Sequence, residues 1–312
     1  MKFRTEVPIK PQQPKIDHKS KIFLLGSCFV ENIGEKLEFF KFQTLQNPFG
    51  ILFHPAAILN FLKNVKSGKV YSEEEIFFHN ERWHCFEVHS ALSSIQKGQI
   101  LDKINSGVEE SQKFLSEATH IIITLGTAWA YRSLESGKIV ANCHKIPQKN
   151  FSKELLDVKE DLTSILEILK SINPKITVIF TVSPVRHLKD GFVGNQRSKS
   201  KLLDAVHKVI SEEEKLNYFP SYEIMMDELR DYRFYAEDMI HPNKIAVDYI
   251  WEKFVQAWMS SETISVMEEI QHIQKGLFHR PFNEESEAHQ KFLKELQNKM
   301  EKLQQAHPQI KF

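Results

Sequence analysis

Five short apolar runs along the chain predict the strands of a buried sheet. The runs are rich in Ile, Val, Phe and Met and do not alternate with polar residues, which is typical of strands covered on both faces. The first run begins at Lys21 and leads into Gly26. The other four lie at residues 42–45, 120–125, 175–182 and 221–226.

Helical patterns separate these apolar runs. They cover residues 29–40, 55–65, 106–117, 153–172, 198–217 and 243–258. Strands that alternate with helices in this way predict a parallel sheet joined by right-handed crossovers. We therefore expect an α/β fold.

Two insertions interrupt the alternation of strands and helices. Residues 76–90 predict a β-hairpin that turns near Asn80 and Glu81, and residues 131–143 predict a second hairpin that turns at residues 135–138. Both insertions fall between strands of the core. We expect them to build a rim over a ligand site and to determine its selectivity.

The two ends of the chain differ in composition from its centre. Residues 1–20 are polar and contain three prolines, which predicts an extended lead-in on the surface. Residues 21–260 form the expected globular domain, and residues 261–312 form a charged helical extension. We expect the apolar face of its last helix to pack on the domain or to join two copies of the chain in a homo-oligomer. That face consists of Phe292, Leu293, Leu296, Met300 and Leu303.

Composition narrows the classes of function. Of the 312 residues, 41% are apolar, which is enough to fill a sizeable core. Lys and Arg number 41, and Asp and Glu also number 41, so no overall field attracts nucleic acid or an anionic membrane. A small, near-neutral ligand is the default expectation.

The number and spacing of the cysteines and the hydropathy of the chain indicate where the protein resides in the cell. The three cysteines, Cys28, Cys85 and Cys143, are widely spaced and do not resemble a disulfide framework, which favours a reducing compartment. No segment reaches the roughly 18 apolar residues of a membrane span. We therefore expect a soluble cytoplasmic protein.

The most informative segment of the chain is residues 21–31, which runs from a strand through Gly26-Ser27-Cys28 into a helix. Open α/β sheets bind ligands at the carboxyl ends of their strands, where the amides of the following helix attract anions. A serine at such a junction is more often an N-cap of the helix. The functional interpretation makes Ser27 a nucleophile.

Residues 237–243 contain a carboxylate and an imidazole that could activate that serine. Asp238 and His241 lie three residues apart before a predicted helix, so the carboxylate can hold one imidazole nitrogen while the other faces Ser27. Each residue alone has an ordinary explanation, as a helix cap or as a structural histidine. Together the three side chains supply the hydroxyl, base and carboxylate of a Ser-His-Asp hydrolase.

Other reactive side chains offer alternatives. Cys28 would be activated at a helix N-terminus, which leaves a Cys-His hydrolase open, although small buried cysteines usually pack in the core. His79, His84 and His89 recur every five residues, a spacing that does not align three ligands on one strand face. We therefore expect no metal site.

Three residues near the expected site are candidates for substrate binding. Arg186 and His187 follow the fourth strand, where a guanidinium could bind a carboxylate or phosphate. Trp129 follows the third strand and could stack on a sugar ring. The ordinary alternatives are a salt bridge in a loop and an aromatic residue of the core.

Several blocks of the chain carry a resemblance to a known family. The junction reads Gly26-Ser27-Cys28-Phe29-Val30, and further blocks lie at residues 47–50, 124–127, 142–145, 181–187 and 238–242. These residues resemble the GSCFA domain family, whose name comes from Gly-Ser-Cys-Phe-Ala, with Val30 here in place of the last alanine. The family is grouped with SGNH-type, or GDSL-like, acyl hydrolases. The resemblance covers about residues 21–258.

The resemblance implies a fold and a set of roles. The fold is a flavodoxin-like three-layer sandwich with a five-stranded parallel sheet of order 2-1-3-4-5. Ser27 is the nucleophile, His241 is the base, and Asp238 orients the imidazole. Hydrolysis in this family type needs no metal or other cofactor.

The same resemblance assigns the oxyanion hole only in part. The backbone amides of Ser27 and Gly50 match two of the three donors that SGNH hydrolases use. The third donor is usually an Asn two residues after the glycine of the third block, where this chain has Ala128 after Gly126. Asn142 is the substitute to test first, with Gly126 as a further candidate. Loss of one donor costs on the order of 10² to 10³ in turnover.

Two functions from different classes follow. The leading hypothesis is a serine esterase that hydrolyses an acyl ester, such as an acetyl ester, of a carbohydrate or small molecule through an acyl-enzyme. The alternative is a protein that keeps this fold and binds a glycan or another ligand with weak turnover or none, because fold alone does not establish activity. An assembly role for the C-terminal helix is compatible with the esterase.

Overall fold

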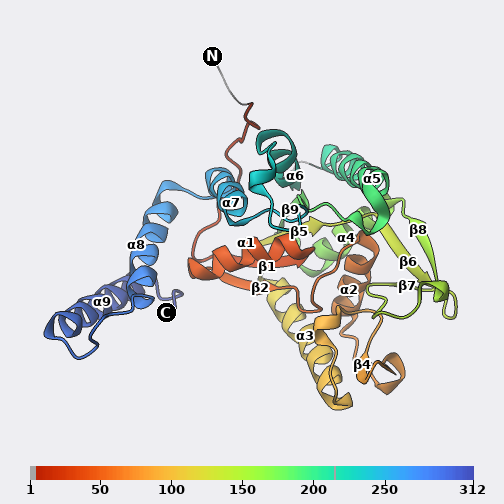
Figure 1. Ribbon diagram of the computed structural model, residues 1–312, viewed down its shortest axis with the longest axis horizontal. Helices are drawn as coiled ribbons and strands as arrows, with labels where there is room; N and C mark the ends of the chain where they lie inside the picture. Colours follow the sequence, from red (N-terminus) through yellow and green to blue (C-terminus); the bar gives the residue numbers. More distant parts are fainter. Residues whose placement is uncertain (1–4, 214–215) are drawn as a thin grey trace.

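The core of the protein is a five-stranded parallel sheet (Figure 1). The computed structural model describes residues 5–213 and 216–312. The strands lie in the order β10-β9-β5-β1-β2, which is 2-1-3-4-5 when these core strands are numbered along the chain, so the flavodoxin-like sheet is confirmed. The strands are β1 (Lys21–Gly26), β2 (Gln43–Gln46), β5 (His120–Leu125), β9 (Thr177–Val182) and β10 (Leu216–Tyr218).

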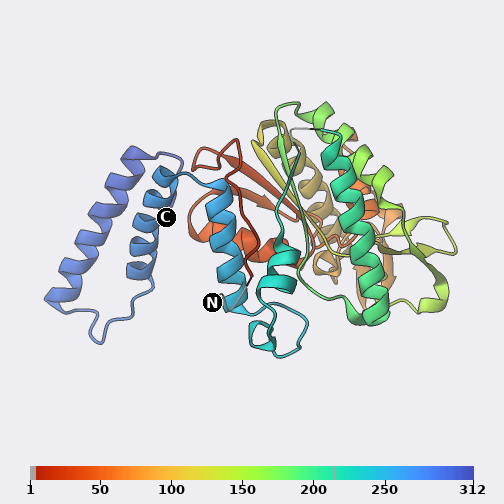
Figure 2. The same cartoon turned by 90° about the horizontal axis from the view of Figure 1, so that it is seen from above.

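Helices cover both faces of this sheet (Figures 1 and 2). On one face, Phe23 of β1 and Ile121 of β5 share an apolar cluster with α2, α3, α4 and α5. On the other face, their neighbours Ile22 and Ile122 share a second cluster with α1 and α7. Every residue of β5 and β9 is therefore buried, and the expected three-layer sandwich is confirmed. The helices are α1 (Cys28–Phe39), α2 (Pro55–Ser67), α3 (Lys97–Glu117), α4 (Val158–Ile172), α5 (Gly191–Ser211) and α7 (Lys244–Trp258).

The last strand differs from the prediction. Residues 221–226 are not a strand but form α6 (Ser221–Glu223) and the start of a π-helical turn, η5 (Ile224–Glu228). A short apolar run does not distinguish a buried helical turn from a buried strand, and the sheet ends instead at the short strand β10. The helix predicted at 198–217 is the longer α5, which begins and ends earlier. Residues 214–215 of that prediction lie outside the described residues.

Both insertions form antiparallel strands. In the first, β3 (Phe77–His79) pairs with β4 (Arg82–His84), and the intervening Asn80 and Glu81 have φ values of 45° and 59°, as a two-residue hairpin turn requires. In the second, β6 (Trp129–Ser133) pairs with β7 (Ile139–Val140) and also with β8 (Phe151–Leu155).

The start of the helix predicted at residue 153 is therefore wrong. Residues 153–155 belong to β8, and α4 begins at Val158 after its N-cap Asp157. Short 3-10 turns complete the connections at Glu73–Glu75, Ser90–Leu92, Gln148–Asn150, Leu188–Asp190 and Tyr232–Phe234.

The C-terminal extension is a helical hairpin at one side of the sandwich (Figures 1 and 2). Its helices are α8 (Ser261–Leu277) and α9 (Glu287–Ala306). Leu296 and Leu303 of α9 are buried in the same cluster as α1 and α7, whereas Phe292 and Leu293 are 37% and 40% exposed. Three of the five residues of the predicted apolar face, Leu296, Met300 and Leu303, thus pack within the protein. The described part of the chain contains no helix with the length and apolar character that a membrane span needs.

The lead-in is anchored to the end of α7. Ile16 is completely buried, and its amide donates to the carbonyl oxygen of Trp258 at 2.8 Å. The same residue forms an isolated parallel bridge with Met259. The N-terminal segment therefore packs on the same side of the sheet as α1 and α7.

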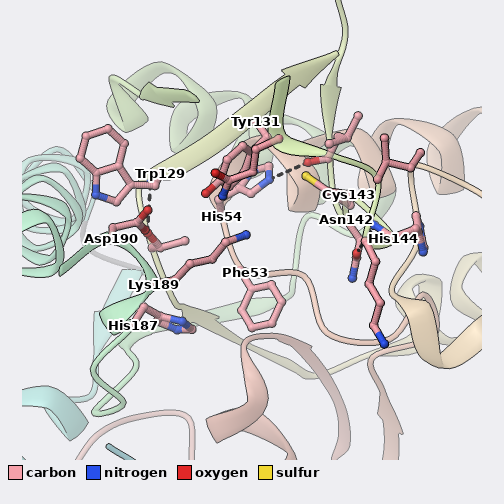
Figure 3. Close-up of a pocket in the computed structure, with 16 residues that line it drawn as sticks. Phe53, His54, Trp129, Tyr131, Asn142, Cys143, His144, His187, Lys189 and Asp190 are labelled. Carbon is pink, nitrogen blue, oxygen red and sulfur yellow. Dashed lines mark hydrogen bonds between the residues drawn. The ribbon is translucent and has the colours of Figure 1, made fainter. Parts of the chain in front are cut away.

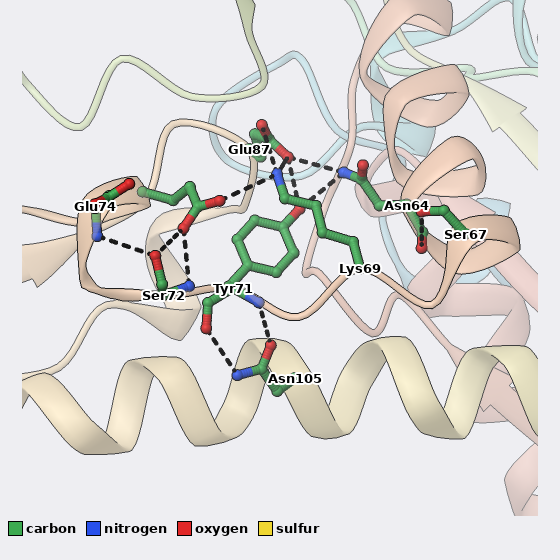
Figure 4. Close-up of polar contacts among 9 residues, drawn as sticks. Asn64, Ser67, Lys69, Tyr71, Ser72, Glu74, Glu87 and Asn105 are labelled. Carbon is green, nitrogen blue, oxygen red and sulfur yellow. Dashed lines mark hydrogen bonds and ion pairs between the residues drawn. The ribbon is translucent and has the colours of Figure 1, made fainter.

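The partly buried carboxylate of Glu87 fixes the segment between α2 and the first hairpin (Figure 4). The Tyr71 hydroxyl and the Asn64 amide donate to Glu87 Oε2 at 2.6 and 2.8 Å, and the Lys69 ammonium lies 3.3 Å from the same oxygen. Asn105 of α3 accepts the Tyr71 amide at 2.7 Å. Burial alone would raise the pKa of Glu87, but the Tyr71 hydroxyl and the Lys69 charge more than offset burial, and the pKa lies below its ordinary value. The charged carboxylate therefore stabilises this region.

Replacing Glu87 with Gln should lower the free energy of unfolding at pH 7 by about 1–3 kcal/mol, because several donors lose a charged acceptor. Since the folded-state pKa is depressed, this contribution is complete above the unfolded pKa of about 4.3 and is lost as the pH falls through the folded pKa. Urea denaturation at pH 7 and at pH 3 measures both effects. Glu74→Gln, at an exposed position of the same segment, is the matched control and should change stability by less than about 0.5 kcal/mol. Equal losses in both variants would contradict the stabilising role of the Glu87 carboxylate.

Candidate active site

The junction between β1 and α1 requires a close approach of two strands. Gly26 has a φ of 133°, and a Cβ at this position would lie 2.1 Å from the Thr124 carbonyl oxygen in β5. Glycine is needed there because any side chain would collide with that carbonyl. The Gly26 amide donates to the side-chain oxygen of Asn47 at 2.9 Å, so the segment after β2 holds the turn. Ser27 is thereby placed at the carboxyl edge of the sheet.

Ser27 occupies the N-cap position of α1 without capping the helix. Its side chain makes no cap hydrogen bond, the residue is completely buried, and Oγ has no partner among the described residues. The ordinary role of an N-cap serine therefore does not account for this hydroxyl. A buried hydroxyl without a partner costs about 1–3 kcal/mol, and such groups are rare in native proteins.

Asp238 and His241 form a hydrogen-bonded pair in the loop before α7. Asp238 Oδ2 lies 2.6 Å from His241 Nδ1, and Oδ1 accepts the amides of Ile240 and His241 at 2.9 and 3.0 Å. These amides, followed by the imidazole, lower the pKa of Asp238 to about 2. A charged carboxylate at this distance favours the proton on Nδ1, so Nε2 of a neutral His241 carries the lone pair.

The loop that carries this pair is tied to the segment after β9. The Arg186 amide donates to the Ile240 carbonyl oxygen at 3.5 Å, and the Ala236 amide donates to the His241 carbonyl oxygen at 2.7 Å. The pair therefore lies at the carboxyl edge of the sheet, as Ser27 does. The expected hydrogen bond between Ser27 and His241 is not made in this structure, because Ser27 Oγ has no partner among the described residues.

A cavity of about 490 Å³ lies at this edge of the sheet (Figure 3). Its walls come from the second insertion, from the segment at residues 140–146 and from the loop that follows β9. Three of the residues singled out in the sequence, Trp129, Asn142 and His187, line it. Arg186 instead points its guanidinium at Met226 Sδ, at 3.1 Å.

Charged side chains from the loop after β9 enter the cavity. Lys189 extends across it, with its ammonium 4.6 Å from the centre of the Tyr131 ring (Figure 3). Asp190 forms an ion pair with Lys153 of β8, whose ammonium also lies 4.2 Å from the centre of the Trp129 ring. The carboxylate of Asp190 is thus neutralised by its partner, and the cavity presents a cation and aromatic faces to a ligand.

His187 connects the cavity with Ser27. A Cβ on Gly126 would lie 2.9 Å from the Phe53 carbonyl oxygen, 3.1 Å from Ser27 Cβ and 3.3 Å from His187 Nε2, so these groups converge on one glycine. Burial, followed by the nearby Lys199 and His241, lowers the pKa of His187 to about 4. Its imidazole is therefore neutral at pH 7.

The backbone amides assigned to the oxyanion hole are occupied in this structure. The amides of Ser27, Gly50 and Gly126 donate to backbone carbonyl oxygens at 2.9, 2.7 and 2.9 Å. A backbone N–H group carries a single hydrogen, so these amides would have to leave their carbonyl partners to bind an oxyanion, and their assignment stays a prediction. Asn142 accepts the His144 amide with its side-chain oxygen at 2.8 Å and belongs to the cavity wall.

A buried lysine missed by the sequence predictions supports the end of β5. Lys199 of α5 is completely buried, and its Nζ donates to the carbonyl oxygens of Gly126 at 2.9 Å and Ser183 at 2.7 Å. It therefore links the segments that follow β5 and β9. The buried positions of α5 recur at helical spacing and include 195, 199, 202, 206 and 209, so this spacing is the signal that could have revealed Lys199 as a core residue.

The other reactive side chains have structural explanations. Burial is the main cause that raises the pKa of the Cys28 thiol, and the charge of Glu31 adds to it. A raised pKa disfavours the thiolate that a Cys-His hydrolase needs. Both ring nitrogens of His54 and His84 are engaged in hydrogen bonds. Within residues 5–213 and 216–312, no group of three or more His, Cys, Asp or Glu side chains is placed to hold a metal ion.

These features define a flavodoxin-like α/β protein with a cavity and a polar cluster at the carboxyl edge of its sheet. The chain belongs to the GSCFA family: the family model matches residues 21–254, and the model of the GSCFA domain protein C-terminal domain matches residues 270–312. No relative is found among the curated proteins. Among solved structures, a family 3 carbohydrate esterase of Clostridium thermocellum is similar at 8% identity and a TM-score of 0.36, over 80% of this chain and 97% of that chain.

Stability should rise with pH between about 7 and 10 because of Lys199. Burial lowers the folded-state pKa of this lysine to about 7, whereas an unfolded chain keeps about 10.4. Below pH 7 both states are protonated, and the folded protein carries the full cost of a buried ammonium. Above pH 7 the folded state releases its proton first, so this cost falls. The neutral amine still has two N–H groups for the two carbonyls.

Urea denaturation of the wild type and of Lys199→Met at pH 6.5, 8 and 9.5 measures this effect. The free energy of unfolding of the wild type, minus that of the variant, should increase with pH across the series. Lys201→Met, which changes an exposed lysine of the same helix, is the control and should show no such trend. A difference for Lys199→Met that is independent of pH would contradict the titration.

Proposed function

We propose that this protein is a serine acyl hydrolase of the SGNH type that cleaves an acyl ester, such as an acetyl ester, of a carbohydrate or another small molecule. The observation that carries the proposal is the 2.6 Å contact between Asp238 and His241 at the edge of the sheet where Ser27 lies. In this reaction Ser27 Oγ attacks the acyl carbon, and His241 Nε2 takes the hydroxyl proton. Asp238 holds the imidazole in the required orientation.

The remaining steps follow from the same three side chains. Protonated His241 returns its proton to the leaving alcohol, which produces an acyl ester on Ser27. A water molecule then attacks that ester while His241 again acts as the base, and the acid is released. No step assigns a proton to Asp238, whose pKa of about 2 keeps it charged throughout.

The proposal requires Ser27 to form its hydrogen bond when substrate is bound. Catalytic hydrogen bonds are often long in free enzymes and tighten in the complex. Ser27 Oγ makes no hydrogen bond within the described residues, so a movement toward His241 breaks none. The exposed fraction of the His241 side chain, 49%, leaves the imidazole room to move.

The cavity supports a small substrate. Its volume of about 490 Å³ is within the usual range of about 300–1,000 Å³ for small-molecule sites. Trp129 and Tyr131 offer aromatic faces on which a sugar ring could stack. The three free cysteines suit a reducing compartment, and we place the activity in the cytoplasm on that basis.

A binding protein without efficient turnover is the second candidate. Two observations favour it: Ser27 is completely buried, and the amides expected to stabilise an oxyanion are already hydrogen-bonded. In this case the cavity would hold a glycan or another ligand without cleaving it. The cavity residues would then matter for affinity, and Ser27 would not matter for turnover.

Labelling with a fluorophosphonate and hydrolysis of acetyl and short-chain aryl esters separate these functions. The esterase predicts that the wild type is labelled, that Ser27→Ala is not, and that Cys28→Ala keeps its label. Ser27→Ala and His241→Ala should lower kcat by at least about 10³-fold. Hydrolysis by the wild type no faster than by Ser27→Ala would favour the binding protein, and loss of the label in Cys28→Ala alone would favour a thiol nucleophile.

We also propose that the exposed part of α9 joins two copies of the chain. Phe292 and Leu293 remain 37% and 40% exposed on a helix that buries Leu296 and Leu303. Changing both to Ser should reduce the mass measured by light scattering from dimer to monomer and leave ester hydrolysis unchanged. Lys291→Ser, at an exposed position of the same helix, is the control. A wild type that is monomeric at about 100 µM would refute this assembly.

A further inference from the structure

We infer that His187 is a catalytic residue that donates a hydrogen bond from Nε2 to the carbonyl oxygen of the acyl group while Ser27 attacks it. The inference rests on the proposed function and supplies the side-chain donor that Ala128 cannot provide. The bond from Ser27 Oγ to the acyl carbon forms, and the carbonyl electron pair moves onto the oxygen that His187 holds. The proton of His187 stays on Nε2, and the hydroxyl proton goes to His241.

The first observation is a group of buried polar atoms without partners. Among the described residues, Ser27 Oγ, Thr124 Oγ1 and His187 Nε2 are all buried and make no hydrogen bond. Thr124 belongs to the end of β5, directly before the Gly126 segment. Unpaired buried polar atoms are few in native proteins, so their concentration at one strand end indicates a place where a polar ligand group binds.

The second observation is the position of His187 relative to Ser27. Ser27 Cβ and His187 Nε2 lie 3.1 and 3.3 Å from the point that a Cβ of Gly126 would occupy. Both groups therefore border the same small space. His187 also lines the cavity, whereas Ser27 is buried behind it. An acyl carbon placed beside Ser27 therefore has the His187 ring as a neighbour on the side of the cavity.

The third observation is that the surrounding residues hold this histidine. The His187 amide donates to Asn195 Oδ1 at 3.0 Å, and Asn195 is only 2% exposed. The imidazole lies against the Phe53 ring, with the ring centres 5.4 Å apart and nearly perpendicular planes. A donor that is already in place loses little free energy to reorganisation when the oxyanion develops.

The neutral imidazole of His187 is better suited to donate a hydrogen bond than to act as a general base. Burial, together with the charges of the neighbouring Lys199 and His241, lowers the pKa of His187 to about 4. The ring therefore stays neutral at pH 7, and such a weakly basic imidazole is a poor acceptor for the proton of Ser27. A neutral imidazole with hydrogen on Nε2 can still donate to a developing oxyanion.

Other donors are less well placed in this structure. The amides of Ser27, Gly50 and Gly126 are committed to carbonyl oxygens, and the Ala128 amide donates to Ser198 Oγ at 2.7 Å. Asn142 is the remaining competitor, because it also lines the cavity. The test must therefore distinguish His187 from Asn142.

Steady-state kinetics with 4-nitrophenyl acetate provides the first test. His187→Ala should lower kcat about 100-fold and raise KM by no more than about fivefold, because the bond strengthens as the oxyanion develops. His187→Gln, which retains a side-chain N–H, should recover part of kcat. Asn142→Ala tests the competing donor and should lower kcat less than His187→Ala does. His272→Ala, at an exposed position of α8, is the matched control and should keep kcat within about threefold. An unchanged kcat in His187→Ala, or the larger loss in Asn142→Ala, would overturn the inference.

A second measurement does not depend on turnover. In the Ser27→Ala variant labelled with ¹⁵N-histidine, titration with 4-nitrophenyl acetate should shift the His187 Nε2 resonance, which is assigned by its absence in Ser27→Ala/His187→Gln. Replacing His187 should weaken binding of this ester about fivefold, as expected for one neutral hydrogen bond. If the wild type fails to hydrolyse esters but this shift occurs, the proposed esterase fails and the carbonyl contact stands. If neither the resonance nor the affinity changes, the contact itself is refuted.

Discussion

The ammonium of Lys199 holds together the two strand ends on which the candidate site depends. The carbonyl oxygens of Gly126 and Ser183 point into the protein, where they need donors. A long side chain from α5 can reach both oxygens at once. The cost is the desolvation of a basic group, which appears as a pKa lowered to about 7. The hydrogen bond from Lys199 fixes Gly126 in its position beside Ser27 and His187.

Close backbone contacts make this arrangement specific. Gly26 lets β1 approach β5 at its carboxyl end, and Gly126 lets the Phe53 segment, Ser27 and His187 meet without a side chain between them. The same contacts bury polar atoms that have no partner among the described residues. Such atoms reduce stability, and folds usually retain them where a ligand or a reaction uses them. The large apolar clusters on both faces of the sheet can offset that loss.

The site combines a regular core with added structure. The carboxyl edge of the parallel sheet carries Ser27 and the Asp238–His241 loop, as open α/β sheets generally carry their ligand sites. The second insertion supplies Trp129 and Tyr131 of the cavity wall, and the loop after β9 supplies Lys189. The core strands therefore position the candidate triad, while the second insertion and the loop after β9 line the cavity.

The sequence by itself determined the buried strands, their parallel sheet and the pairing of Asp238 with His241, because continuous apolar runs and residues three apart in a turn depend on local spacing. It did not determine the short edge strand β10 or the end strand β8, whose residues are too few or too polar to show a pattern. Only the tertiary structure decided that Lys199 supports Gly126, that His187 lies beside Ser27, and that the expected oxyanion amides are occupied. Each of these depends on atoms from distant segments meeting at one point, and local periodicity carries no information about such contacts.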